Sequence, residues 1–411
     1  RDMQNHSRAR PTPHSPRPNA ACRAVCHPRP PQGVAPGQMT STAKGPQVRR
    51  MSSADLGIIH DKIPWRFCFV GGWMDLKWVN EHWNGCIVTI NIKFHAGICK
   101  DECGLATSSR KVLAKIWDGK PPTHLTAMEA AQCLWGAENF HAAATEERTY
   151  YAGSQDHIGL FFPGINKLCY SGGRHWPYEV VSLNDPSDPK QKAIFDWLER
   201  VVHIVDIPFV SRPEGYSSQE VNYLKDPNVP NATKAAMVKA LAEASEAAWQ
   251  AIIAMDADKL GKALSDTMEA WQVALPYTVN PYLGKDESKG KQLAEFVAKY
   301  DRPHTKGCLF SGAGGGFLMV ISEAPVAGAM QMKLNHDHIV KPYDSDTLAY
   351  ATQHNSCSAP PPKPPWGEWS PWQFDLEGKP LNKPVSPYRK YYVAGAVAAA
   401  LAAGVLLGRK M

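Results

Sequence analysis

The sequence predicts an α+β fold, and its 411 residues are enough for two domains of ordinary size. Three observations predict this class. Short runs rich in β-branched and aromatic residues indicate strands, and two long Ala-rich runs have the apolar spacing of amphipathic helices. The strands and helices also interleave without the regular β-α alternation that a doubly wound sheet requires.

The expected elements follow from these patterns along the chain. Strands are expected at residues 66–70, 87–94, 308–310 and 317–322, and residues 196–210 indicate the end of a helix followed by a strand. Helices are expected at residues 106–117, 127–140, 233–254, 256–273, 289–299 and 326–334.

Residues 1–50 differ from the rest of the chain in charge. They hold nine Arg or Lys, nine prolines and one acidic residue, whereas the other 361 residues hold 36 basic and 38 acidic side chains. We therefore expect a disordered segment over residues 1–55, and no nucleic-acid-binding surface on the body. The segment is either an organelle transit peptide or a stretch upstream of a start at Met51. Without a secretory region or a cysteine framework, the protein is expected inside the cell, in the cytoplasm or an organelle.

The C-terminal part predicts a linker and a membrane anchor. Residues 346–390 predict an extended linker, because nine prolines and three tryptophans fall between positions 356 and 390. Residues 391–408 carry no charge and are followed by Arg409 and Lys410. This length and the flanking cations predict a single transmembrane helix that anchors the protein to a membrane. Because alanines make the segment weakly hydrophobic, a buried or interfacial helix is the alternative.

Two stretches join a predicted strand or helix to small residues. IPWRFCFVGGWMDL, residues 63–76, is a strand followed by Gly71, Gly72 and Asp75. ECGLATSSRKVLAK, residues 102–115, opens a helix with small and hydroxyl side chains. The free N–H groups of a helix N-terminus are suited to cradle a phosphate, although an ordinary Ser or Thr cap is the alternative.

Two further stretches carry unusual residues. SGAGGG, residues 311–316, lies between two predicted strands, where glycine is tolerated if the backbone turns sharply or lets another group approach. A glycine-rich hairpin turn is the plain alternative. YYAGSQDHIGLFFPGINKLCY, residues 150–170, places an acidic residue, Asp156, after Gly153, Ser154 and Gln155.

Taken in their order along the chain, the four stretches resemble motifs of the GHMP kinase family, in its sugar-kinase branch of heptose and fucose kinases. The resemblance spans residues 61–342. It implies an S5 domain 2-like N-terminal domain at residues 56–190 and a ferredoxin-like C-terminal domain at residues 191–345, with the site between them. It also implies that the protein transfers the γ-phosphoryl group of ATP, with Mg²⁺, to a sugar hydroxyl.

The resemblance implies roles for particular residues. Asp156 would be the catalytic base, and Arg66 would stabilise the transferred phosphoryl group. Gly72, Asp75 and Gln155 would bind the sugar. Ser108 and Glu138 would bind Mg²⁺, with Glu146 or Glu147 as the alternative carboxylate. The nucleotide would be held by Gly104, Leu105, Ala106, Thr107, Ser108, Ser109, Ser311, Gly312, Ala313 and Gly314.

Each central side chain also has a simpler alternative role. Asp156 could be a solvated loop acid, Arg66 an exposed strand residue and Asp75 a helix cap. The chain departs from the family pattern in having only 28 residues between Asp75 and Gly104, a region that helps to hold the adenine in that family. It also has Ala106 in place of a glycine and Arg110 at the helix start, which would either grip a phosphate or be exposed.

Two other functions stay open at this point. The first is a catalytically impaired binding or scaffold protein of the same fold, tethered to a membrane. The second is a decarboxylase of the same fold that acts on a phosphorylated acid. The sequence predicts neither the sugar nor the oligomeric state.

Overall fold

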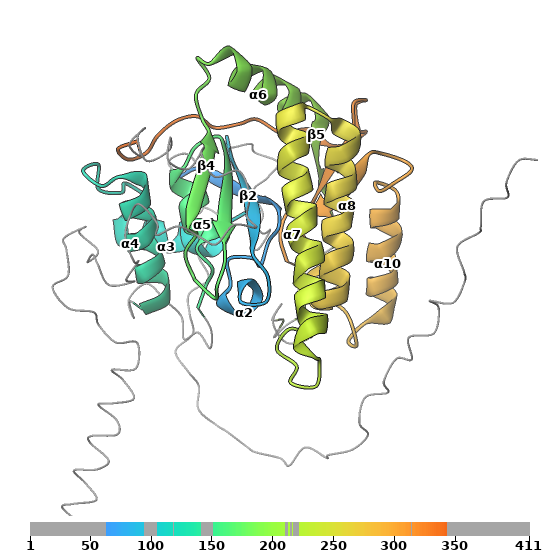
Figure 1. The fold of residues 1–411 in the computed structure, drawn as a ribbon. Helices are drawn as coiled ribbons and strands as arrows, with labels where there is room; N and C mark the ends of the chain where they lie inside the picture. Colours follow the sequence, from blue (N-terminus) through green and yellow to red (C-terminus); the bar gives the residue numbers. More distant parts are fainter. Residues whose placement is uncertain are drawn as a thin grey trace, which may run out of the picture. The chain divides into compact units, whose positions relative to one another are not determined.

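The computed structural model describes residues 63–93, 105–117, 119–140, 151–209, 213, 216, 222–313 and 315–342 (Figure 1). The chain divides into two compact units, residues 1–50 and 51–411, and every described residue lies in the second. The predicted disordered segment, the linker and the predicted membrane helix at residues 391–408 lie outside the described residues. Of the helices that the structure describes, none is long and apolar enough to cross a bilayer.

The first sheet is antiparallel, with its strands in the order β1-β2-β3-β4. β1 (Trp65–Val70), β2 (Gly85–Ile92) and β3 (Ile165–Tyr170) are buried along their whole length, and β4 (Glu179–Leu183) is partly exposed. A strand buried along its whole length needs cover on both faces. α5 (Gln155–Phe161) packs on β1 and β2, and α7 (Asn231–Ala254) also packs on β2.

Successive residues of a strand point to opposite sides of the sheet, so the two faces of this sheet meet different helices. A Cβ on Gly159 of α5 would collide with Arg66 and contact Thr89. Asn91 Nδ2 donates to the carbonyl oxygen of Gly159 at 2.8 Å. On the other face, Lys167 Nζ lies 2.7 Å from Glu246 Oε2 of α7. α5 therefore covers a face that carries polar side chains, and those side chains include part of the candidate site.

Two helices extend the layer that α5 begins. α3 (Thr107–Trp117) packs on α4 (Ala127–Phe140), and α4 packs on α5. The apolar spacing predicted α3 and α4 to within one residue at each end. Trp135 of α4 and Phe161 of α5 are among the largest fully buried side chains, so the layer is joined to the sheet by a packed core.

The second sheet is also antiparallel, with its strands in the order β6-β7-β5-β8. These strands are β5 (Val202–Asp206), β6 (Gly307–Phe310), β7 (Phe317–Ile321) and β8 (Met330–Gln331). α6 (Pro189–Val201) runs directly into β5, as the pattern at residues 196–210 predicted. The remaining helices of the described ranges are α2 (Lys77–Asn80), α8 (Ala257–Ala274), α9 (Pro276–Val279) and α10 (Glu287–Ala298).

A helical hairpin contacts both sheets. α7 and α8 lie side by side over their length (Figure 1), with α7 against β2 of the first sheet and α8 against β6 and β7 of the second. The segment after β8 also returns to the first sheet, where Lys93 N–H donates to Lys333 O at 2.9 Å and Asn335 N–H donates to Asn91 O at 2.9 Å. Elements distant in sequence therefore join the two sheets.

The structure confirms the α+β class as two four-stranded antiparallel sheets with helices. The finer names for the two domains and the boundary at residue 190 stay predictions. The helix expected at residues 326–334 was wrong: Gly328 has a φ of +74° in a turn, and Met330 pairs with Ile204 at the edge of the sheet. The free edge of β5 offered hydrogen bonds that outweighed the weak helical pattern.

Candidate functional site

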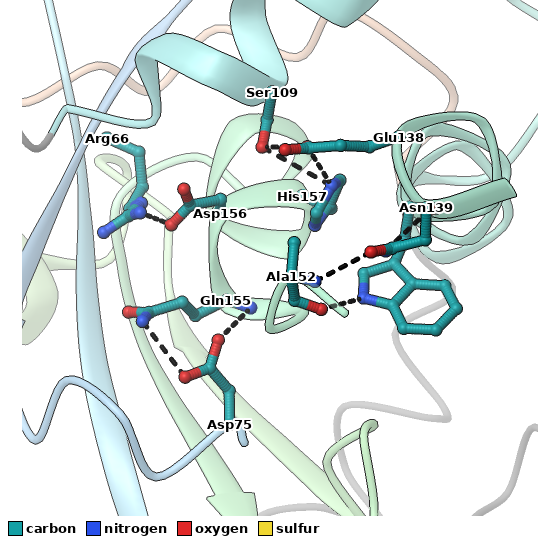
Figure 2. A network of polar contacts seen from close by, with 10 residues as sticks. Arg66, Asp75, Ser109, Glu138, Asn139, Ala152, Gln155, Asp156 and His157 are labelled. Atoms are coloured by element: carbon teal, nitrogen blue, oxygen red, sulfur yellow. Dashed lines mark hydrogen bonds and ion pairs between the residues drawn. The ribbon is translucent and has the colours of Figure 1, made fainter. Parts of the chain in front are cut away.

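The first turn of α5 brings the candidate residues together (Figure 2). Gln155, Asp156 and His157 are consecutive, and successive residues of a helix point about 100° apart. Each therefore meets a different part of the protein. Gln155 contacts Asp75 on the loop after β1, Asp156 contacts Arg66 on β1, and His157 contacts Glu138 on α4.

Arg66 and Asp156 form an ion pair between β1 and α5. The Arg66 side chain is 3% exposed, whereas that of Asp156 is 27% exposed and lies in a helical first turn. The simpler roles of exposed strand arginine and loop acid were therefore wrong. Burial lowers the pKa of the Arg66 guanidinium from its ordinary value, against the opposing effect of Cys68 and Asp75. Its Nε and Nη1 atoms are buried without an N or O hydrogen-bond partner among the described residues, and the Cys68 thiol is the polar group that interacts with the guanidinium from the same strand.

Asp75 lies on a strained turn that follows β1. Gly71 has a φ of +76°, and Trp73 has a φ of +86°, which is costly for a residue with a side chain. The Asp75 carboxylate accepts the Gln155 backbone N–H at 3.2 Å and the Gln155 Nε2–H at 3.1 Å. The cap of α2 is Leu76, without a side-chain cap, so the helix-cap role for Asp75 was wrong.

Burial gives Asp75 an unusual protonation behaviour. It raises the pKa of the Asp75 carboxyl to about 6, although the Gln155 N–H and the Arg66 charge act in the opposite direction. A Cβ on Gly153 would overlap the Asp75 carboxyl group, so glycine is needed at that position. Gly153 therefore leaves the space that the Asp75 carboxyl group occupies.

Ser109, Glu138 and His157 form a second group on the other side of α5. Ser109 Oγ donates to Glu138 Oε2 at 2.6 Å, and His157 Nε2 lies 2.7 Å from the same oxygen and 3.4 Å from Ser109 Oγ. All three side chains are buried. The resemblance implied Ser108 for this neighbourhood, but Ser108 is exposed and Ser109 makes the contact with Glu138.

Ser109, Glu138 and His157, in the positions that they occupy here, do not form a suitable binding site for Mg²⁺. Mg²⁺ prefers oxygen ligands and keeps several of its waters. Glu138 is fully buried, and a serine hydroxyl and an imidazole already share its Oε2. Among the described residues there is no group of three or more His, Cys, Asp or Glu placed to hold a metal ion. The alternative carboxylates Glu146 and Glu147 lie outside the described residues.

The predicted phosphate cradle is described from Leu105 onward, and Gly104 lies outside the described residues. Ala106 has a φ of +58°, a left-handed conformation that favours glycine, so the alanine at this position is strained. Thr107 is half-buried and Ser108 is exposed at the start of α3, so both can be reached from solvent.

Arg110 does not have either of the roles considered for it. Its side chain is buried, donates from Nε to Pro64 O at 3.0 Å and from Nη2 to Ile63 O at 2.9 Å, and stacks 3.6 Å above the Trp65 ring. It is therefore neither exposed nor placed as a phosphate ligand. Instead, it ties the start of α3 to the segment before β1.

The glycine stretch forms the loop between β6 and β7. Ser311 N–H donates to Phe317 O at 2.9 Å, and Gly315 N–H donates to Gly312 O at 3.2 Å. Gly315 and Gly316 have φ values of +80° and +128°, so the hairpin itself requires glycine there. Gly314 lies outside the described residues, and the nucleotide-binding role of Ser311, Gly312 and Ala313 stays a prediction.

Sequence reasoning missed the residues that support the α5 turn. Trp135 Nε1 donates to Ala152 O at 2.8 Å, and Asn139 Oδ1 accepts the Ala152 N–H at 2.7 Å (Figure 2). Ser154 Oγ lies 3.0 Å from the hydroxyl of Tyr170, whose pKa is raised by burial. A histidine directly after the Gln-Asp pair was the only signal for His157, and the others have no sequence pattern of their own.

The similarity of this chain to known proteins is found in its structure. No protein-family profile and no curated protein matches the sequence. The chain aligns with a D-glycero-D-manno-heptose 1-phosphate kinase from Bacteroides thetaiotaomicron at 13% identity and a TM-score of 0.39, over 66% of this chain and 94% of that one. It aligns with a provisionally assigned sugar kinase from Campylobacter jejuni at 13% identity and a TM-score of 0.36, over 67% and 95%. Such values assign neither a reaction nor a substrate to this chain.

Proposed function

We propose that this protein transfers the γ-phosphoryl group of ATP to a hydroxyl group of a sugar. The Arg66–Asp156 pair supports this proposal most directly. Asp156 offers a partly exposed carboxylate beside a buried guanidinium that keeps two donors without an N or O partner in the described residues. A hydroxyl nucleophile needs such a carboxylate, and a transferred phosphoryl group needs such a cation.

Each residue of the site has a proposed role. Asp156 accepts the proton of the attacking hydroxyl, and Arg66 stabilises the negative charge of the phosphoryl group. Asp75 and Gln155, which are bonded to each other beside this pair, bind further sugar hydroxyls. Ser108 and Thr107 contribute to phosphate binding from the start of α3. Mg²⁺ enters with ATP as part of that substrate.

An assay of ATP consumption on a panel of free sugars and sugar phosphates tests the proposal. The full chain should form ADP with at least one sugar, and Asp156→Asn should lower kcat by about 100-fold or more, the usual contribution of a general base. Calorimetric titration with ATP should give the same Kd for both proteins, because Asp156 is not proposed to hold the nucleotide.

Asp196→Asn is the matched control for this substitution. Asp196 lies on α6, where it forms an exposed pair with Lys192 at 2.6 Å, so the loss of its charge should change neither kcat nor stability. If Asp156→Asn keeps full activity, Asp156 has no part in the reaction. If no sugar supports ADP formation by the wild type, the proposed activity is wrong.

A second candidate function is a binding or scaffold protein that keeps the fold without catalysis. The family resemblance assigned Mg²⁺ to the Glu138 carboxylate, but this carboxylate is buried. A protein without that cation ligand would keep the fold and lose the reaction, so the burial of Glu138 favours the second candidate. Such a protein would bind ATP or a sugar in calorimetric titration and form no ADP. The ATP titration and the sugar panel together separate the two candidates.

A further inference from the structure

We propose that Ser109, Glu138 and His157 form a buried clamp that sets the direction of Asp156, and that Glu138 is a positioning residue and not a cation ligand. The inference rests on the proposed function for the role of Asp156. In this proposal, Ser109 and His157 occupy the position beside the Glu138 carboxylate where the family resemblance implied Mg²⁺.

The clamp joins three helices. Ser109 is on α3, Glu138 is on α4 and His157 is on α5, and their side chains meet at 2.6 Å, 2.7 Å and 3.4 Å without contact with solvent. A buried carboxylate is stable where donors satisfy it. Ser109 Oγ donates to Glu138 Oε2, and His157 Nε2 lies 2.7 Å from the same oxygen. Because a carboxylate only accepts hydrogen bonds, this contact assigns the proton to Nε2 of His157 and gives Oε2 a second donor. The carboxylate therefore needs no cation to be satisfied at that oxygen.

His157 directly follows Asp156, which gives the clamp its effect on the site. Because α5 is a single short helix, the rotation of its first turn decides where Asp156 points. Gln155 is bonded to Asp75, Asp156 to Arg66 and His157 to Glu138, so three neighbouring side chains hold this turn from three directions (Figure 2). If the His157 bond is removed, the turn can rotate and the Asp156 carboxylate leaves its position. A displacement of about 1 Å is enough to cost a large factor in rate.

Kinetics of His157 variants of the full chain test the clamp. His157→Leu should lower kcat by about tenfold or more and change KM for ATP by about twofold at most. His157→Gln keeps an N–H for Glu138 and should recover most of that loss. His203→Leu is the matched control, because His203 is also buried but bonds to Ser322 O at 3.1 Å in the second sheet. It should lower thermal stability and leave kcat unchanged.

Hydrogen exchange gives a readout that does not depend on turnover. The amides of α5 should exchange faster in His157→Leu than in the wild type, and those of α8 should not change. Unchanged α5 exchange, or an unchanged kcat in an active protein, overturns the clamp. An inactive wild type would refute the proposed function instead, and the exchange data would still decide whether the clamp exists.

Titration with Mn²⁺, followed by electron paramagnetic resonance with and without ATP, tests the second half of the inference. Wild type and Glu138→Gln should bind Mn²⁺ equally, within about twofold, because the buried carboxylate is not a ligand. A wild-type Mn²⁺ site that Glu138→Gln weakens by about tenfold or more would show that Glu138 binds the cation, and would overturn the proposal.

Discussion

Asp75 shows how far burial changes the chemistry of a single residue. The carboxyl group is enclosed by the turn after β1 and by the start of α5, and its pKa of about 6 lies well above the ordinary value of 3.8. Burial is the largest cause, because the charged carboxylate loses its hydration. The two donors of Gln155 stabilise the charged form only in part. At neutral pH the folded protein therefore keeps a buried charge at an energetic cost.

The pH dependence of stability should reveal this cost. Because the folded pKa is above the unfolded one, the folded state binds the proton more tightly between pH 3.8 and about 6. The contribution of Asp75 is therefore fully present below about pH 4 and is lost as the pH rises through 6. A shift of roughly two pKa units corresponds to about 3 kcal/mol in the free energy of unfolding.

Asp75→Asn isolates this contribution, because the amide does not titrate. The free energy of unfolding of the wild type, relative to that of the variant, should be greater at pH 4 than at pH 7 by about 2–2.5 kcal/mol. Denaturant unfolding at a series of pH values measures it. The altered contacts of the amide with Gln155 add an offset that does not depend on pH. Parallel curves for the two proteins would contradict the raised pKa.

At the scale of the elements, backbone conformations outside the site also carry strain. α7 ends at Ala254, and its C-cap Met255 has a φ of 53° and a ψ of 42°, the left-handed conformation common at a helix C-terminus. Glycine is preferred at such positions, because a Cβ costs roughly 1–2 kcal/mol there. The Met255 residue is 42% exposed, so little packing compensates. The tight turn into α8 therefore stores strain that no proposed function uses.

Met255→Gly should raise the free energy of unfolding by about 0.5–1 kcal/mol, the relief of strain less the greater freedom of glycine in the unfolded chain. Met255→Ala keeps the Cβ and serves as the control, so it should show no such gain. Denaturant unfolding of both variants at one pH measures the difference. Equal stabilities for the two variants would mean that this turn is not strained.

At the scale of the whole molecule, the α7–α8 hairpin links the two sheets to the site. Trp271 of α8 is buried and donates from Nε1 to Gly72 O at 3.1 Å, on the turn that leads to Asp75. Lys167 of β3 pairs with Glu246 of α7 at 2.7 Å, and the segment at residues 333–335 adds bonds to the first sheet. The proposed sugar-binding turn is thus supported by a helix that packs on the other sheet.

Trp271→Phe tests this connection. The variant loses one hydrogen bond, leaves the Gly72 carbonyl without that donor and removes buried ring volume, which together should cost about 2–4 kcal/mol in the free energy of unfolding. Because the hairpin joins both sheets, hydrogen exchange should accelerate in β1 and β6 alike. Acceleration confined to β6 would show that the two sheets unfold independently.

Elements with strong local patterns could be predicted from the amino-acid sequence. The apolar spacing placed α3, α4, α7 and α8 within two residues of their observed ends, because an amphipathic helix needs only its own periodicity to be recognised. The family resemblance of the four motifs also implied roles for Arg66, Asp75, Gln155 and Asp156, which the structure brings together. The transmembrane helix predicted at residues 391–408 rests on the sequence alone, because these residues lie outside the described part of the chain.

Features that depend on neighbours from distant parts of the chain became visible only in the folded structure. It replaced the expected helix at residues 326–334 with a strand, because the edge of β5 offered partners that no local pattern records. It put Ser109 and not Ser108 beside Glu138, because the rotation of α3 against α4 selects the inward side chain. It buried Arg110 against Trp65 and brought His157 to Glu138. Side-chain direction and burial are properties of packing, and packing is settled only when the helices and both sheets meet.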